Sequence, residues 1–159
     1  MPQTGIFNYP SIDRIVFGEP LIEAVQKEAD RLLVERIFVL ASGIISRETP
    51  CIEDLRATMK GKIAGVFDRL RPHVQRDDVI AATAEARAVQ ADLILTIGGG
   101  TPTNAAKMVS FCLANDVSEY EGLDPLRWVS NPDGTALQPP SKVPTVRSVF
   151  VPTTLSAGE

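Results

Sequence analysis

The chain has 159 residues, a formal net charge of −4 and a sequence pI near 5.1. Its Lys and Arg residues do not cluster, which argues against nucleic acid as a partner, because neutralising phosphates requires grouped cations. No apolar run approaches the roughly 20 residues that cross a bilayer, so we expect no association with a membrane. The length suits one domain with a core of its own, over residues 1–159.

The N-terminal residues lack a basic start followed by an apolar stretch, so no secretory signal is predicted. Two cysteines, Cys51 and Cys112, are too few for a disulfide framework. We expect both thiols to be reduced packing residues, and this cysteine usage favours a cytoplasmic protein.

Apolar periodicity divides the chain into alternating strands and helices. Helices are predicted where apolar residues recur every three or four positions, and buried strands where short runs are continuously apolar. Strands are predicted over residues 13–18, 36–42, 62–68, 92–100 and 145–154. Helices are predicted over residues 20–35, 48–59, 76–91 and 101–115. Prolines and an Asn-Pro-Asp-Gly turn signal predict a long loop over residues 124–144.

This alternation predicts an α/β fold, in which a mostly parallel, doubly wound sheet carries helices on both faces. Ligands of such sheets bind outside the carboxyl ends of the strands. The stretch LILTIGGGTPTNAAKMVSFCL, residues 93–113, places three consecutive glycines at such an end. The carboxyl end of this strand is therefore the first place to look for a ligand.

The three glycines, Gly98 to Gly100, are predicted to form an anion site. Glycine adopts positive φ angles and leaves no Cβ between its backbone and an approaching group. Thr101 can cap the next helix and Pro102 can occupy its first position, so free N–H groups and the helix dipole would converge there. A phosphate or pyrophosphate fits this arrangement, although a purely structural tight turn has the same residues. The pattern is neither G-x-G-x-x-G nor a Walker loop, since Lys107 stands seven residues beyond Gly100.

Four segments resemble the iron-containing alcohol dehydrogenase family in their order and spacing. TIGGGTPTNAAK resembles the family's phosphate-binding G-G-G-S-x-x-D-x-A-K, and VFVPTTLSAGE resembles its I-P-T-T-x-x-T-G-S-E. IVFGEP resembles the F-G-x-G near the family's N-terminus, and YEGLDP resembles a segment that follows the phosphate helix. Together these segments span nearly the whole chain.

The resemblance implies a Rossmann-like N-terminal domain that binds NAD or NADP. The family's second domain is all-helical and carries the ligands of a divalent metal, iron or zinc, usually an Asp and several His. The resemblance covers only the first domain, so we expect the helical C-terminal domain to be absent from residues 1–159. His73, the single histidine, does not suffice for a metal site, and we expect it at the surface. We predict no metal ligands here and no activity of this chain alone.

Nine residues are implied as cofactor contacts by the same resemblance. The glycine turn would bind the pyrophosphate, paired threonines would line the cofactor cleft, and two residues of the next helix would lie beside the phosphates. These residues are Gly98, Gly99, Gly100, Thr101, Asn104, Lys107, Thr153 and Thr154, with Ser42 at the end of the second strand. Asn104 replaces the family's Asp and carries no charge, and a solvated helix lysine is an equally good interpretation of Lys107. The segment TTLSAGE also departs from the family pattern at Ala157 and Gly158.

Ser42 stands where the family often has an Asp that binds the adenosine ribose and repels a 2′-phosphate. A neutral residue removes that repulsion, so NADP is admissible beside NAD, although an ordinary strand-end serine is the other interpretation. The neutral residues Ser42 and Asn104 also favour the maleylacetate reductase branch. Its members lack the metal and reduce an unsaturated keto acid with NADH or NADPH.

The leading hypothesis is an NAD(P)-dependent oxidoreductase of the iron-containing alcohol dehydrogenase type. It would move hydride between the nicotinamide and a small alcohol, aldehyde or keto acid. The alternatives are a lyase of the dehydroquinate synthase type, which shares the nucleotide domain, and a non-enzymatic nucleotide-binding module. The implied partners are a nicotinamide dinucleotide, a small-molecule substrate and a second copy of the chain. Family members commonly pair through the N-terminal strand region, here residues 5–18.

Overall fold

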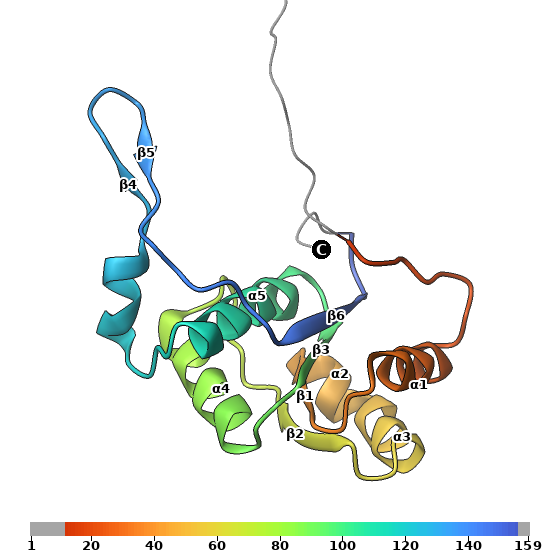
Figure 1. Cartoon of the computed structure of the whole chain (residues 1–159). Coiled ribbons are helices and arrows are strands. Elements are labelled where there is room, and N and C mark those ends of the chain that lie inside the picture. The colour runs from red at the N-terminus through yellow and green to blue at the C-terminus, as the bar shows by residue number, and fades with distance from the viewer. Residues whose placement is uncertain (1–11, 156–159) are drawn as a thin grey trace, which may run out of the picture.

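The computed structural model describes residues 12–155. Its centre is a four-stranded sheet in the order β2-β1-β3-β6 (Figure 1). The strands are β1 (Ile37–Ala41), β2 (Ile63–Phe67), β3 (Leu93–Gly98) and β6 (Arg147–Pro152). All three strand pairings are parallel, which confirms the sheet predicted from the alternation of strands and helices.

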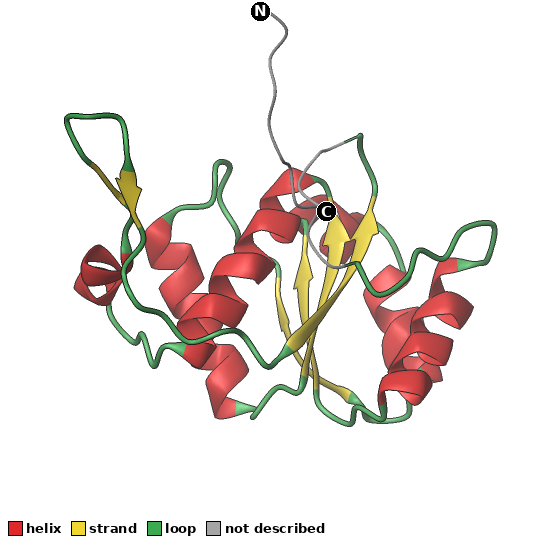
Figure 2. Ribbon diagram, turned by 45° about the horizontal axis from the view of Figure 1, so that its top comes forward, coloured by secondary structure: helices red, strands yellow, loops and turns green. Residues whose placement is uncertain are grey.

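Helices cover both faces of this sheet (Figure 2). One face carries α1 (Leu21–Leu32), α2 (Gly43–Glu48) and α3 (Cys51–Thr58), and the other carries α4 (Arg76–Ala88) and α5 (Gly100–Ala114). Side chains of β1 alternate between the two cores: Ile37 and Val39 pack with α1 and α3, whereas Phe38 and Leu40 pack with α4 and α5. A strand buried on both faces reads as a continuous apolar run, which is why IFVLA was predictable.

The direction in which the chain leaves each strand places the candidate site. From β1 it continues into α2 and α3 on one face, and from the neighbouring β3 it continues into α5 on the opposite face. The two connections diverge, and doubly wound sheets bind their ligands outside the carboxyl ends of the strands at such a point. This is the topological switch point of a doubly wound sheet.

The structure of two segments, residues 13–18 and helix α2, differs from the sequence prediction. Residues 13–18 form no strand in the described structure, and Ile15 and Phe17 are 75% and 88% exposed. Their short apolar run is typical of a strand, but no described strand pairs with the segment. The short helix α2 was missed because it has six residues and buries none of them, so it carries no apolar periodicity.

The segment predicted as a long loop, 124–144, is also more ordered than expected. It begins inside a 3₁₀ helix, η1 (Tyr120–Leu126), and continues into a hairpin of β4 (Val129–Ser130) and β5 (Ala136–Leu137). The Asn-Pro-Asp-Gly signal does make the hairpin turn, where the Gly134 N–H donates to the Asn131 carbonyl at 3.0 Å and Gly134 has a φ of 83°. The hairpin projects away from the sheet (Figure 1).

Two general predictions can be compared with the described residues. No helix within residues 12–155 has the length and hydropathy needed to cross a membrane. Cys51 and Cys112 are both free, and burial raises the pKa of each thiol, so neither favours the nucleophilic thiolate. The positions Ala157 and Gly158, and the part of the predicted pairing region before residue 12, lie outside the described residues.

Candidate functional site

Backbone hydrogen bonds tie together the carboxyl ends of three neighbouring strands. The Ser42 N–H, just after β1, donates to the carbonyl of Ile97 on β3 at 3.0 Å. The Thr153 N–H, just after β6, donates to the carbonyl of Gly98 at 3.0 Å. The structure therefore brings Ser42, Gly98 and Thr153 to one edge of the sheet, as the sequence predicted.

The turn after β3 requires glycine at two positions. Gly98 has a φ of 152°, and a Cβ there would lie 2.9 Å from Pro102 Cγ and 3.2 Å from Ser42 Cβ. A Cβ on Gly99 would lie 2.6 Å from the hydroxyl oxygen of Thr154. Real Cβ atoms do not come within 3.0 Å of other atoms, so Pro102 on α5 and Thr154 after β6 leave room only for bare backbone at this turn, and Ser42 lies close beside it.

Helix α5 begins at Gly100, directly after this turn. Gly99 is its N-cap residue, whereas Thr101 was predicted as the cap and instead lies in the first turn of the helix. The prediction was wrong by two residues because a glycine also serves at an N-cap and the helix could therefore start earlier. The N–H groups of Gly100 and Thr101 have no acceptor inside the helix, and the positive end of its dipole adds to them.

Ser42 occupies the corresponding position after β1 and is the N-cap residue of α2. Its Oγ accepts a long hydrogen bond, 3.4 Å, from the Ile45 N–H. The side chain is half-buried and neutral, and it lies beside the glycine turn. The serine thus stands at the switch point between β1 and β3.

Arg47 of α2 also lies at the carboxyl end of β1, on the side of β2, and was not identified from the sequence. Its guanidinium rests on the backbone of Gly43, because a Cβ on Gly43 would lie 2.7 Å from Arg47 Cζ and 2.9 Å from Nη1. Only the absence of a side chain at position 43 permits this approach. The sequence holds a faint signal, a Ser-Gly pair at the end of a buried strand, but no pattern that links it to Arg47.

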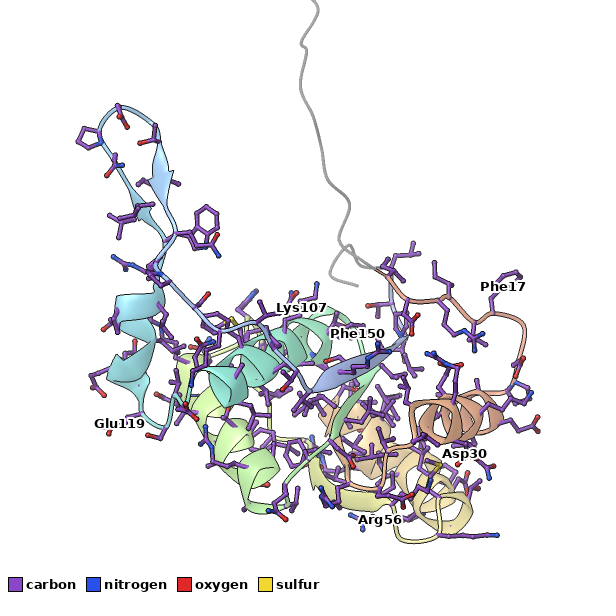
Figure 3. The ribbon with its side chains drawn as sticks, in the orientation of Figure 1. Phe17, Asp30, Arg56, Lys107, Glu119 and Phe150 are labelled. Carbon is purple, nitrogen blue, oxygen red and sulfur yellow. The ribbon has the colours of Figure 1, made fainter. Side chains whose placement is uncertain are left out.

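Asn104 and Lys107 lie farther along α5 than the glycine turn. The Lys107 ammonium lies 5.9 Å from the ring centroid of Phe150 on β6, and both residues are labelled in Figure 3. Phe150 pairs in register with Thr96, two residues before Gly98, so the ammonium lies over the sheet rather than at its edge. Asn104 is exposed and lines a groove described next.

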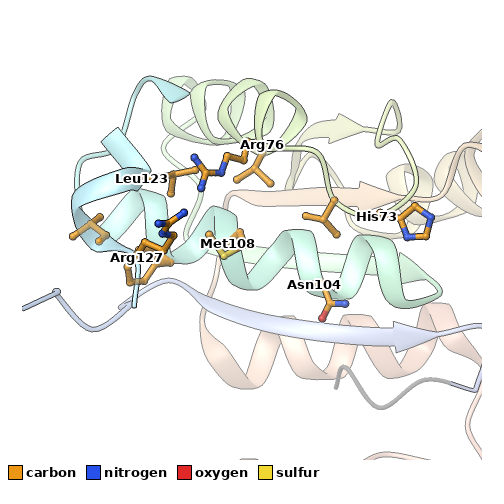
Figure 4. A pocket seen from close by; sticks show the side chains of 10 residues that line it. His73, Arg76, Asn104, Met108, Leu123 and Arg127 are labelled. Carbon is orange, nitrogen blue, oxygen red and sulfur yellow. The ribbon is translucent and has the colours of Figure 1, made fainter. Parts of the chain in front are cut away.

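The groove lies between α4, α5 and η1 and has a volume of about 470 Å³ (Figure 4). Its lining is mostly apolar, with polar groups contributed by residues that include His73, Arg76, Asn104 and Arg127. His73 is exposed, as expected, but it has a φ of 67° and is followed by Val74 with a φ of 52°. Consecutive left-handed conformations at residues other than glycine are uncommon. The groove itself was not predicted from the sequence.

The described residues do not suit a metal. Within residues 12–155, no group of three or more His, Cys, Asp or Glu side chains is placed to hold an ion. We therefore assign no metal-dependent step to these residues.

The comparisons with known proteins identify the family of the chain. The family model described as iron-containing alcohol dehydrogenase matches residues 12–159. The chain belongs to the iron-containing alcohol dehydrogenase family. The maleylacetate reductases found among the curated relatives are consistent with the resemblance to that branch.

Two curated relatives illustrate the family match. The chain is 32% identical to dehydrogenase FUM7 of Gibberella moniliformis over 151 aligned residues. This alignment covers 91% of this chain and 34% of that protein. It is 33% identical to maleylacetate reductase 1 of Cupriavidus pinatubonensis over 100 aligned residues. This second alignment covers 63% of this chain and 27% of that protein. The chain thus matches between about a quarter and a third of the length of these relatives.

A solved structure shows the same fold. The sulfoacetaldehyde reductase of Bifidobacterium kashiwanohense, determined in complex with NAD⁺, superposes with a TM-score of 0.62 at 15% identity. The match covers 69% of this chain and 29% of the reductase. At this identity, the likeness establishes a shared fold and no more.

Proposed function

We propose that this chain is the NAD(P)-binding domain of an oxidoreductase. The enzyme would transfer hydride between the nicotinamide and a small alcohol, aldehyde or keto acid. In this proposal the cofactor supplies or accepts the hydride, and residues of this chain bind and orient it. Residues 1–159 would form the dinucleotide-binding domain, and the substrate chemistry would need residues beyond it.

The enclosed glycine turn at the switch point carries this proposal. Free N–H groups at the start of α5 suit a pyrophosphate, and Gly99 leaves open the space beside the Thr154 hydroxyl. Gly98, Gly99, Gly100 and Thr101 would hold the pyrophosphate in the manner of other doubly wound sheets.

The flanking strand ends would hold the two halves of the dinucleotide. Ser42 after β1 would contact the adenosine ribose, and Thr153 and Thr154 after β6 would line the cleft toward the nicotinamide. Asn104 and Lys107 would contact the cofactor from α5, on the side of the sheet that carries the groove. Support for a dinucleotide comes from the related reductase structure determined with NAD⁺.

The relatives favour a reductase that acts on a carbonyl compound. Maleylacetate reductases from several bacteria are 28–33% identical to this chain over about 100 residues. Their names identify a keto acid as the substrate of those proteins. Among the three substrate classes named above, we therefore favour a keto acid as the substrate of the whole enzyme.

A nucleotide titration tests the proposal. NADH and NADPH fluorescence would be followed as each is titrated with the chain and with the Gly99→Val variant. We expect saturable binding of at least one nucleotide, weakened at least about tenfold in the variant, because the new side chain would fill the turn against Thr154. Ala88→Val, at an exposed position near the end of α4, is the matched control and should bind like the parent.

Two results would contradict the proposal. One is a folded parent chain, verified by circular dichroism, that binds neither nucleotide. The other is equal binding by the parent and the Gly99→Val variant, which would make the glycine turn a purely structural feature.

A further inference from the structure

We infer that Arg47 is a specificity-determining residue that binds the 2′-phosphate of NADP at the carboxyl end of β1. The inference rests on the proposed dinucleotide site and adds to it which form of the cofactor this chain prefers. It is carried by the position of the Arg47 guanidinium over Gly43.

The guanidinium lies beside the position at which the adenosine ribose is expected. Ser42 and Gly43 follow β1 directly, and the Ser42 N–H is bonded across to β3, next to the glycine turn. Arg47 lies one helical turn after Gly43, and its Cζ would be 2.7 Å from a Cβ at that position. A cation therefore stands against the backbone just after β1, and its pairing with Asp68 after β2 places it on the side of that strand end away from β3.

The chemistry of the strand end favours a phosphate over a ribose diol. In doubly wound sheets an acidic residue at the ribose position accepts hydrogen bonds from the 2′-hydroxyl, whereas a nearby arginine accommodates a 2′-phosphate. Here Ser42 replaces the acid and Arg47 supplies the cation. The planar guanidinium can bind two phosphate oxygens at once.

One carboxylate faces Arg47 and must be considered as a competitor. Asp68, the residue after β2, has a carboxylate oxygen 3.6 Å from Arg47 Nη1. That separation is too long for a hydrogen bond, so the ion pair holds the guanidinium near Gly43 without occupying its donors. The Arg47 side chain is 65% exposed, so a phosphate can reach it from solvent.

Paired titrations of the chain with NADPH and NADH test the inference by binding rather than by activity. We expect the parent to bind NADPH more tightly than NADH. Arg47→Gln should weaken NADPH binding by about tenfold or more, because a charge-assisted hydrogen bond is lost, and should leave NADH binding within about twofold. Arg56→Gln is the control, since Arg56 is an exposed arginine of the neighbouring helix α3 (Figure 3) and should change neither affinity.

Gly43→Ala provides a second, independent variant. Its Cβ would displace the guanidinium, whose long side chain can move at small energetic cost, so it should also reduce the preference for NADPH. Equal or tighter binding of NADH by the parent would overturn the inference, and so would an equal loss of both nucleotides in Arg47→Gln. Either of these results leaves the dinucleotide site intact. Binding of neither nucleotide by the folded parent would instead overturn the proposed function and this inference with it.

Discussion

Thr96 is a buried residue whose hydroxyl has no hydrogen-bond partner among residues 12–155. It lies on β3 opposite Leu40 and Phe150, both of which belong to the core under α4 and α5. A hydroxyl buried in apolar surroundings without a partner destabilises a protein by about 1–3 kcal/mol. The position therefore favours a residue of the same shape without the hydroxyl.

Thr96→Val should raise the free energy of unfolding by about 1 kcal/mol, because it replaces the unpaired hydroxyl with a methyl group of similar size. Urea denaturation followed by circular dichroism measures the change. Thr83→Val is the matched control, since Thr83 is equally buried but donates a 2.7 Å hydrogen bond to the Val79 carbonyl. The control should not gain stability, and a loss of stability in Thr96→Val would contradict the prediction.

Single residues also show how far the candidate site could be predicted from sequence. Gly98, Gly99 and Ser42 were predictable because strand ends meet at one edge of a parallel sheet, and strands can be located from apolar runs. Arg47 was not predictable, because its position depends on a side chain that folds back across a glycine four residues earlier. Sequence patterns locate backbone elements well, but they do not specify where a long exposed side chain lies.

At the scale of elements, an ion pair clamps the connection between β2 and α4. Asp78, in the first turn of α4, accepts hydrogen bonds from the Arg71 backbone N–H at 2.7 Å and from its Nε at 2.9 Å. The Asp78 side chain is only 12% exposed. The Arg71 guanidinium holds the pKa of the Asp78 carboxyl below its ordinary value, despite the opposing effect of burial.

This clamp predicts a specific loss of stability in acid. The pKa of Asp78 is lower in the folded chain than in the unfolded chain. The ionised carboxylate therefore makes its full contribution to the free energy of unfolding above the unfolded pKa, about 3.9. The contribution is lost as the pH falls from about 4 through the lowered folded value. Asp78→Asn should reduce the free energy of unfolding at pH 7 by about 1–2 kcal/mol, and the difference from the parent should shrink below pH 4.

Chemical denaturation at a series of pH values measures this dependence. Asp77→Asn is the control, because Asp77 is the neighbouring carboxylate but is 72% exposed and lies 3.7 Å from Arg71. It should change stability by less than about 0.5 kcal/mol at any pH. A difference between parent and Asp78→Asn that stays constant down to pH 2 would contradict the assignment to this carboxylate.

The elements themselves were predictable where burial imposes a period. The strands β1, β2 and β3 and the helices α1, α3, α4 and α5 bury apolar side chains, and β6 half-buries its own, so their sequences carry the pattern. Residues 13–18 contain an apolar run typical of a strand but remain exposed, whereas α2 is a helix that has no fully buried residue and no apolar periodicity. In neither segment does the apolar pattern predict the observed structure.

At the scale of the whole molecule, exposed apolar side chains gather at two separate places. Phe17 projects from the segment before α1, and Ile15 lies in the same segment (Figure 3). The hairpin exposes Trp128, Val129 and Leu137 on the opposite side of the sheet. Apolar residues grouped on a surface are typical of an interface with another protein.

We propose that the first of these places pairs two copies of the chain. Phe17 and Ile15 lie in an extended segment that is tied to helix α1 by two hydrogen-bonded ion pairs. Arg14 donates to Glu28 and Asp13 accepts from Arg31, both at 2.8 Å. The segment is thus held in place while its apolar side chains face outward. Sedimentation velocity should therefore detect a dimer of the parent chain, and Phe17→Asp should shift it to monomer by placing a charge in the interface.

Leu137→Asp distinguishes this interface from the hairpin. Leu137 is 62% exposed, so the substitution introduces the same charge at a similarly accessible apolar position without disturbing the core. It should leave the sedimentation coefficient of the parent unchanged. A monomeric parent would contradict the proposed dimer. A dimer that dissociates in Leu137→Asp but not in Phe17→Asp would show that the hairpin, and not the segment before α1, forms the interface.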